Sequence, residues 1–287
     1  MALDLDTLAS MTGAAANTVT RLGGGDVAES YRVDLADGST VFAKTHRNPP
    51  PGFFTTEATG LSWLRDAAAV PVPTVIGVSD DPPLLVLEWI EEDRAGRARA
   101  DEAAFGTALA SLHAAGAPAF GREDGRTTGS RGLPNDQADT WVEFFAERRL
   151  LPLARLAADA AALSADEVRR LEAVANNLTE LAGPPEPPAR LHGDLWAGNR
   201  LVDADGRSWL IDPACFGGHR EFDLAMMRLF GGFGPDCFAA YAEAAPLADG
   251  WADRVPLHQL APLVVHAIKF GGGYRGAVVD ALDRLGH

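Results

Sequence analysis

The chain has 287 residues, and its 40 acidic and 25 basic residues give a formal net charge of −15 at pH 7. A balance this acidic argues against nucleic-acid binding and against docking on anionic lipid, because both need lysine and arginine to neutralise phosphate. It is compatible with a cationic small-molecule substrate. The length allows one large domain or two lobes with a well-buried core.

The first ninety residues are predicted to form strands and a single helix. Apolar and alternating runs predict strands, and a helical period over residues 54–69, ended by prolines, predicts the helix. The turn Ala36-Asp37-Gly38 lies between the second and third runs and predicts a hairpin. The predicted strands cover residues 18–22, 27–35, 39–45, 75–78 and 84–90.

The composition changes after Ile90. Residues 91–99 are charged and without period, as in a linker, and a predominantly helical pattern follows. The predicted helices cover residues 101–115, 138–158 and 164–181, the last with a capping box at its start, and further helices begin near residues 222, 235 and 257. The long connection 116–136 has no period. These patterns predict an α+β, bilobal protein-kinase-like fold, with an N-terminal nucleotide-binding lobe (1–90), a hinge (91–99) and a mainly helical catalytic and substrate lobe (100–287).

Residues 192–212, HGDLWAGNRLVDADGRSWLID, carry the strongest functional signal. Asp194 and Asn199 have the spacing of a kinase catalytic loop, and an Asp-Gly turn between two apolar runs then brings Asp212 back toward them. Each residue alone has a structural explanation, such as a turn cap or a strand end. Together they favour phosphoryl transfer, with Asp194 as catalytic base and Asn199 and Asp212 holding Mg²⁺. His192 is expected to orient the loop by hydrogen bonding.

The N-terminal part supplies candidates for binding ATP. Gly23, Gly24, Gly25 and Ser30 lie between two predicted strands, where glycines let backbone N–H groups approach phosphate, although a flexible hairpin turn is an equal alternative. Lys44 ends an apolar strand, Val41-Phe42-Ala43-Lys44, as the phosphate-binding lysine of kinases does.

Two further features of this part concern the lysine's partner and the adenine. Glu57, on the apolar face of the predicted helix, is the expected ion-pair partner of Lys44, the alternative being a solvated glutamate and a lysine that reaches water. The strand that leads into the linker implicates Glu88 and Ile90 in adenine binding through their main-chain atoms.

Several longer motifs resemble the fructosamine kinase (ketosamine-3-kinase) family. They are LHGDLWAGN at 191–199, LIDPA at 210–214, GHREFDLAM at 218–226, RLFGGF at 228–233 and W-x-x-F-F-x-x-R-R-L at 141–150, and the resemblance extends over residues 22–245. Aminoglycoside and choline phosphotransferases share H-G-D-x-x-x-x-N but usually lack the tryptophan and the G-H-R-E signature. Residue Asp26, where many relatives have cysteine, and the segment 121–134 depart from the family pattern.

The resemblance implies ATP-dependent phosphorylation of a sugar hydroxyl on a ketosamine, with ATP and Mg²⁺ as cofactors. It makes Trp196, His219 and Arg220 candidates for the substrate side. The structural alternatives are that Arg220 pairs with a local carboxylate and that Trp196 only packs. Asp223, which opens a helix, is expected to cap it or to brace the catalytic loop. His113 is expected to be a core histidine with its hydrogen bonds satisfied.

Other functions remain open from the sequence. An aminoglycoside-type phosphotransferase fits the acidic charge, whereas a choline-type enzyme needs an aromatic cage that the three tyrosines do not obviously form. A nucleotide-binding pseudokinase is a further alternative, although such proteins commonly lose one of the five groups present here, Lys44, Glu57, Asp194, Asn199 and Asp212.

The location and state of the protein are expectations of the same kind. The cysteines Cys215 and Cys237 have no metal-binding spacing, no secretory leader precedes them, and no apolar run reaches the length of a membrane span. We expect buried free thiols in a cytoplasmic monomer, with a disulfide between the two cysteines as the alternative.

Overall fold

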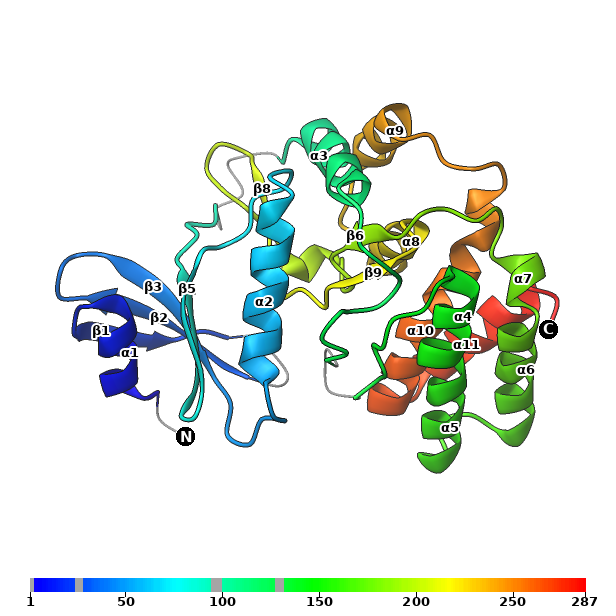
Figure 1. Cartoon of the computed structure of the whole chain (residues 1–287), viewed down its shortest axis with the longest axis horizontal. Coiled ribbons are helices and arrows are strands. Elements are labelled where there is room, and N and C mark those ends of the chain that lie inside the picture. The colour runs from blue at the N-terminus through cyan, green and yellow to red at the C-terminus, as the bar shows by residue number, and fades with distance from the viewer. Residues whose placement is uncertain (1–2, 24–27, 94–99, 127–131) are drawn as a thin grey trace. The chain divides into compact units, whose positions relative to one another are not determined.

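A computed structural model describes residues 3–23, 28–93, 100–126 and 132–287 (Figure 1). The chain divides into two compact units. The first comprises Met1–Asp101 with Gly198–Ala214, and the second comprises Glu102–Ala197 with Cys215–His287.

The first unit is built on an antiparallel sheet of five strands in the order β1-β2-β3-β5-β4 (Figure 1). The strands are β1 (Ala16–Arg21), β2 (Glu29–Leu35), β3 (Thr40–Thr45), β4 (Val75–Asp80) and β5 (Pro83–Glu88). The predicted hairpin between the second and third strands is present, and Gly38 takes a φ of 88° in its turn, a conformation that favours glycine. All five predicted strands are therefore confirmed, with boundaries that shift by a few residues.

Two helices accompany this sheet, α1 (Leu5–Thr12) and α2 (Phe53–Asp66). The hydrophobic period of the sequence predicts only α2. At the start of α1, Oδ1 of Asp4 accepts a hydrogen bond from the Thr7 N–H at 2.7 Å, and Gly13 ends the helix in the left-handed conformation. Leu8 of α1 is buried together with Val33 and Val86 of the sheet. A helix this short depends on such packing, because it is marginal in isolation.

The hairpin of β7 (Arg200–Val202) and β8 (Ser208–Leu210) belongs to the first unit, although the predicted division placed all of residues 100–287 in one lobe. Main-chain hydrogen bonds explain this difference. The N–H of Leu210 donates to the carbonyl of Pro71 at 2.9 Å, and the N–H of Asp93 donates to the carbonyl of Val202 at 2.9 Å. The hairpin thus satisfies its backbone groups against segments from the N-terminal part of the chain.

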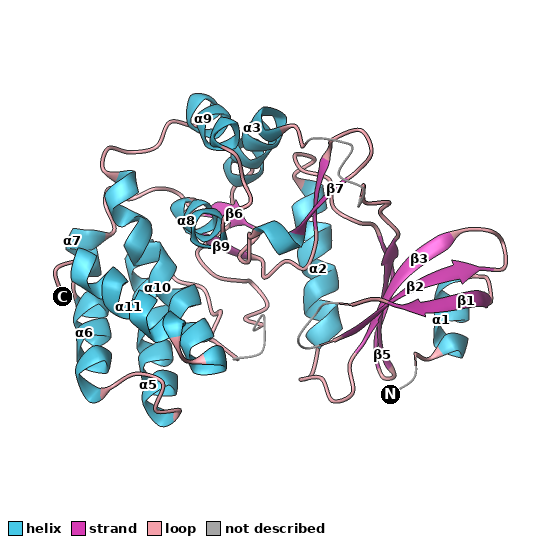
Figure 2. Ribbon diagram, turned by 180° about the vertical axis from the view of Figure 1, so that it is seen from behind, coloured by secondary structure: helices cyan, strands magenta, loops and turns pink. Residues whose placement is uncertain are grey.

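The second unit is mainly helical (Figure 2). Its elements are α3 (Glu102–Ala114), α4 (Trp141–Phe145), the π-helical turn η1 (Ala146–Leu150), α5 (Leu151–Asp159), α6 (Ala165–Asn176), α7 (Leu178–Leu181), α8 (Glu221–Phe230), α9 (Pro235–Ala244), α10 (Trp251–Phe270) and α11 (Gly273–Arg284), with a two-stranded ribbon of β6 (Ala189–Leu191) and β9 (Phe216–Gly218). A single buried cluster of aliphatic and aromatic side chains joins most of these elements into one core.

The helices predicted for this unit are present, but some of them begin or end at other residues than predicted. The capping box of Ser164 and Glu167 is present, but the predicted helix 164–181 is interrupted at Asn177, whose φ of −107° leaves the helical range. Helix α10 begins at Trp251, six residues before the predicted start, and contains Pro256 and Pro262 in its interior. Proline inside a helix removes a backbone hydrogen bond and therefore disfavours helical structure. Burial of many side chains of α10 outweighs this cost.

Both cysteines are buried free thiols, so the prediction of free thiols is confirmed and the alternative disulfide is absent. Among the described residues, no helix combines the length and the apolar character that crossing a membrane requires.

Candidate active site

The β7–β8 hairpin brings the two predicted metal ligands together, as its sequence predicted. Arg200 pairs with Leu210 in register, and Gly206 turns the chain with a φ of 80°. Beyond the paired strands, the N–H of Ile211 donates to the carbonyl of Asn199 at 3.0 Å. Asp212 therefore returns to the position next to Asn199, which is 5 % exposed and ends a single 3₁₀ turn.

Lys44 joins this hairpin to the sheet and to α2 within the first unit. Its Nζ donates to Oε1 of Glu57 at 2.9 Å and also forms an ion pair with Oδ1 of Asp212. The predicted ion pair of Lys44 and Glu57 is thus confirmed. The side chains of Lys44 and Glu57 are only 10 % and 12 % exposed, so the contact between them is shielded from water, and charged hydrogen bonds of this kind are stronger than neutral ones.

Asp212 has a backbone conformation that few residues other than glycine adopt. Its φ is 53°, in the left-handed region that costs most residues about 1–2 kcal/mol and that aspartate tolerates better than bulkier side chains. Its side chain is 43 % exposed, so the carboxylate is accessible from outside the unit. Strained backbone of this type is concentrated at ligand and catalytic sites.

Of the other candidates for phosphate binding, Ser30 is the one that the structure places next to Lys44. Ser30 lies directly opposite Lys44 in the register of β2 and β3, so both side chains stand on the same face of the sheet. Gly23 lies just after β1 in the chain, and the N–H of its neighbour Leu22 donates to the carbonyl of Ser30 at 2.8 Å. Gly24 and Gly25 lie outside the described residues.

The segment expected to meet the adenine is the end of β5. The N–H of Glu88 donates to the carbonyl of Thr74 at 2.8 Å, and its carboxylate accepts hydrogen bonds from the N–H and the hydroxyl of Thr74. Ile90, just beyond the strand, is 9 % exposed. The N–H of Glu88 is already hydrogen-bonded, so a contact between Glu88 and adenine would use the Glu88 carbonyl. Adenine binding by Glu88 and Ile90 remains a prediction.

Asp194 lies in the second unit, on a loop that is held by a buried carboxylate. Asp223, which is 0 % exposed, accepts hydrogen bonds from the N–H groups of His192 at 2.8 Å and Gly193 at 2.9 Å. The N–H of Asp194 in turn donates to Nδ1 of His192 at 3.3 Å. The predictions that Asp223 braces the loop and that His192 orients it by hydrogen bonding are therefore confirmed.

A second layer of buried polar groups holds Asp223 in place. Nε2 of His113 lies 3.3 Å from Oδ2 of Asp223, and Nδ1 of His113 lies 2.8 Å from the hydroxyl of Tyr241. Burial raises the pKa of Tyr241, so its hydroxyl stays protonated beside Nδ1 of His113. His113 is thus the satisfied core histidine that the sequence predicted.

Arg220 is fully engaged within its own unit. Its Nε and Nη2 donate to the two carboxylate oxygens of Glu186, each at 2.7 Å, and its guanidinium also donates to the carbonyls of Ala245 at 3.0 Å and Pro246 at 2.8 Å. The hydrogen bonds to Glu186 raise the pKa of Arg220. This is the structural alternative described above, and these partners do not support a substrate contact by Arg220. The sequence offered no signal for Glu186, which stands in a proline-rich segment without a period.

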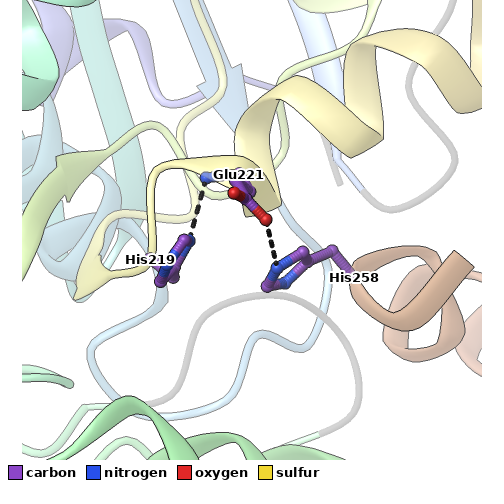
Figure 3. Close-up of side chains that lie close together, drawn as sticks. All are labelled: His219, Glu221 and His258. Atoms are coloured by element: carbon purple, nitrogen blue, oxygen red, sulfur yellow. Dashed lines mark hydrogen bonds and ion pairs between the residues drawn. The ribbon is translucent and has the colours of Figure 1, made fainter. Parts of the chain in front are cut away.

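His219 belongs to a buried cluster with Glu221 and His258 (Figure 3). The N–H of Glu221 donates to Nδ1 of His219 at 3.3 Å, and Oε2 of Glu221 lies 3.3 Å from Nε2 of His258. Their ligand atoms lie within 4.8 Å of one another, a spacing that suits a metal ion. However, Arg254 donates to both oxygens of Glu221 at 2.6 and 2.9 Å, and its positive charge opposes a second cation there. The cluster is better described as an ion-pair network.

The charge states of this network follow from its burial. Burial lowers the pKa of His219 to about 4. For Glu221, burial alone would raise the pKa, but hydrogen bonds from His258 and Arg254 outweigh it and lower the pKa to about 2. His219 is therefore neutral and Glu221 ionised at neutral pH. A substrate contact by His219, which is 3 % exposed, is not supported by this position.

The network predicts an acid-sensitive stability. Between pH 6.5 and about 4 the unfolded chain binds a proton at His219 that the folded chain does not, so the free energy of unfolding falls as the pH is lowered through this window. The largest slope is about 1.4 kcal/mol per pH unit, for a difference of one proton. Urea unfolding at pH 7, 6, 5 and 4.5 measures it. His219→Gln should flatten the slope, His46→Gln should not, and equal slopes in the three proteins would contradict the prediction.

The family model of the fructosamine kinases matches residues 4–286 of the chain. A protein described as a probable ketoamine kinase from Enterococcus faecium is 36 % identical over 263 residues, which cover 90 % of this chain and 91 % of that protein. A chloroplastic protein-ribulosamine 3-kinase from Arabidopsis thaliana is 31 % identical over 283 residues, covering 95 % of this chain and 85 % of that protein.

Solved structures agree with the sequence matches. A crystal structure described as a candidate fructosamine-3-kinase from Thermobifida fusca has a TM-score of 0.88 and 44 % identity, covering 98 % of this chain and 97 % of that chain. The aminoglycoside phosphotransferase APH(4)-Ia, at 16 % identity, has a TM-score of 0.63 and covers 97 % of each chain, which shows a shared fold. The predicted protein-kinase-like fold is confirmed. The chain belongs to the fructosamine kinase family.

Proposed function

We propose that the chain transfers the γ-phosphoryl group of ATP to a hydroxyl group on the sugar part of a ketosamine. Membership in the fructosamine kinase family supports phosphoryl transfer as the reaction. The ketoamine and ribulosamine kinases among the relatives support a ketosamine as the acceptor. The main structural support for a nucleotide site is that Glu57 and Asp212 both contact the buried ammonium of Lys44. Aminoglycoside- and choline-type activities have no such support among the relatives.

The residues of the first unit are proposed to bind the nucleotide. Lys44, positioned by Glu57, would bind phosphate oxygens, with the hydroxyl of Ser30 beside it on the same face of the sheet. Mg²⁺ fits the donor set of Asn199 and Asp212, because it prefers oxygen ligands from amides and carboxylates and these two residues are adjacent across one hairpin. When bound, the ion would neutralise charge on the phosphates.

Asp194 is proposed as the catalytic base. Its carboxylate would accept the proton of the sugar hydroxyl while that oxygen bonds to the γ-phosphorus, and the bond from the γ-phosphorus to the bridging oxygen of ADP breaks. Only four residues separate Asp194 from Asn199, so covalent geometry limits the distance between their Cα atoms to about 18 Å. The brace by Asp223 would keep the loop in one conformation, and such positioning provides much of the catalysis in phosphoryl transfer.

Breaking the ion pair at Lys44 tests the nucleotide role. Glu57→Gln should reduce kcat/KM for ATP by about tenfold, because an amide holds the lysine less firmly than a carboxylate and the loss of one charged hydrogen bond is about 1.5 kcal/mol. Asp66→Asn, an exposed acid on the same helix, serves as the matched control. Unchanged kcat/KM in Glu57→Gln would show that the pair has no part in ATP binding.

The proposed reaction is tested by the release of ADP from ATP and Mg²⁺ with four acceptors in parallel, namely fructoselysine, ribuloselysine, kanamycin and choline. Turnover of a ketosamine alone would establish the reaction and show which sugar is preferred. Turnover of kanamycin or choline alone would keep the phosphotransferase chemistry and overturn the proposed acceptor. ATP binding without turnover of any acceptor would favour the pseudokinase alternative. A cytoplasmic location and a monomeric state remain predictions.

A further inference from the structure

Five aromatic side chains of the second unit form a continuous row that begins beside the catalytic loop. We call it the aromatic row, and its members in order are Trp196, Phe230, His266, Tyr274 and Phe270. Neighbouring ring centroids are separated by 5.0 to 6.0 Å, which is the contact distance of aromatic pairs. The row thus extends over three helices and the loop that carries Asp194.

The backbone holds the first two rings of the row together. The N–H of Trp196 donates to the carbonyl of Asp194 at 3.2 Å, so the backbone that carries this ring turns back onto the proposed catalytic base, two residues earlier in the chain. Phe230 is the last residue of α8, and the chain then turns through Gly231 and Gly232 at φ values of 70° and 87°. A Cβ on Gly232 would lie 2.3 Å from the Cβ of Ala197. Only glycine allows this approach, which brings the end of α8 against the residue that follows Trp196.

Both ends of the row are accessible to a ligand. Trp196 is 39 % exposed and Phe270 is 52 % exposed, while the rings between them are half-buried. A single exposed apolar residue is normal on a protein surface. Here the two exposed rings are joined by a chain of half-buried rings in mutual contact, and contiguous apolar surface is a common mark of a binding site.

The chemistry of a ketosamine matches the row. Such a molecule has a sugar, then a secondary ammonium, then the carbon stem of the parent amine. The C–H face of a sugar and an alkyl stem both pack on aromatic faces, and an ammonium is attracted to them. The ammonium belongs at the Trp196 end, because Nζ of Lys269 already lies 4.8 Å from the ring centroid of Phe270 and would repel a second cation.

His266 adds one polar group to the middle of the row. Its Nδ1 lies 2.8 Å from the carbonyl oxygen of Pro262, so Nδ1–H donates and Nε2 is the acceptor of the neutral ring. An acceptor at this point suits a hydroxyl or ammonium donor of the bound molecule.

We propose that the aromatic row binds the amine-bearing part of the ketosamine, with the ammonium near Trp196 and the stem directed toward Phe270. The enzyme would then prefer ketosamines of amines with long carbon stems, such as a lysine side chain, over those of short amines. This inference rests on the proposed function and names the substrate class of the same site.

The test compares two fructosamines that differ only in the amine. The short one is fructosyl-methylamine, and the long one carries fructose on Nε of Nα-acetyl-lysine methylamide, which has no charge beyond the ammonium. We expect kcat/KM to favour the long substrate by about tenfold or more, as burial of several methylene groups predicts. Phe270→Ala should reduce this ratio about fivefold, mainly through KM, and Phe270→Leu should retain part of it because a leucine still covers the stem.

Leu5→Ala is the matched control, since Leu5 is an exposed apolar residue of the first unit with 43 % exposure. Its ratio should equal that of the wild type. Equal kcat/KM for both substrates in the wild type, or an unchanged ratio in Phe270→Ala, would overturn the inference while leaving the proposed function intact. Absence of turnover with both substrates and with the corresponding pair of ribulosamines would overturn the proposed function and this inference with it. Calorimetric binding of the long substrate to Asp194→Ala measures the same preference without turnover.

Discussion

Replacement of Asp194 by alanine is expected to lower kcat by about a thousandfold and to leave the affinity for ATP within about twofold of the wild type. A positioned general base contributes about 10²–10⁴ to the rate, and Asp194 is also expected to orient the attacking hydroxyl. The nucleotide candidates Lys44, Asn199 and Asp212 lie in the other unit and keep their mutual contacts in this variant. Asp194→Ala should therefore bind ATP normally and turn over very slowly.

Steady-state kinetics with a ketosamine and calorimetric titration with ATP and Mg²⁺ measure the two quantities. Asp205→Ala is the matched control, because Asp205 is an exposed aspartate in the turn of the hairpin that follows the catalytic loop. It should retain full activity. A kcat close to that of the wild type in Asp194→Ala would remove Asp194 from the mechanism.

Replacement of Asp223 by alanine is expected to impair both stability and turnover. The carboxylate is 0 % exposed and accepts the N–H groups of His192 and Gly193, so its removal leaves one buried and one half-buried donor without their acceptor. An unsatisfied buried group costs about 1–3 kcal/mol, and the free energy of unfolding should fall by about 3 kcal/mol. The loop that carries Asp194 also loses its brace, and kcat should fall by about a hundredfold, as in other losses of positioning.

Urea unfolding and kcat at saturating substrates measure these effects, and two further variants show how they arise. Tyr241→Phe removes only the hydroxyl, which contacts His113 and Arg220, so it should cost about 1 kcal/mol and change kcat little. Asp236→Ala removes an exposed acid from the first turn of another helix and should be close to neutral. If Asp223→Ala lost stability but kept its kcat, Asp223 would be a purely structural residue.

Much of the site could be predicted because its signals are local. The kinase spacing of Asp194 and Asn199, the Asp-Gly turn and the return of Asp212 all lie within 21 consecutive residues, and a hairpin brings such residues together by backbone geometry alone. The strands of the first unit and the capping box at Ser164 were predictable for the same reason, since period and cap depend on neighbouring residues.

Other features depended on packing between distant segments. Helix α1 has no strong signal of its own and is stabilised by burial of Leu8 on the sheet. The membership of the β7–β8 hairpin in the first unit follows from hydrogen bonds to Pro71 and Asp93, more than a hundred residues earlier in the chain. Arg220 was expected to face the substrate, but its guanidinium pairs with Glu186. No sequence spacing connects these two residues.

Short motifs whose residues are close along the chain are enough to predict the family, the reaction class and the candidates for the catalytic groups. Three features become visible only in the folded protein. Arg220 forms an ion pair with Glu186, and Asp223 holds the catalytic loop by hydrogen bonds. Rings from a loop and three helices contact one another in the aromatic row. The physical reason is that burial and side-chain contact between distant segments arise only when the core packs, and no local pattern records that packing.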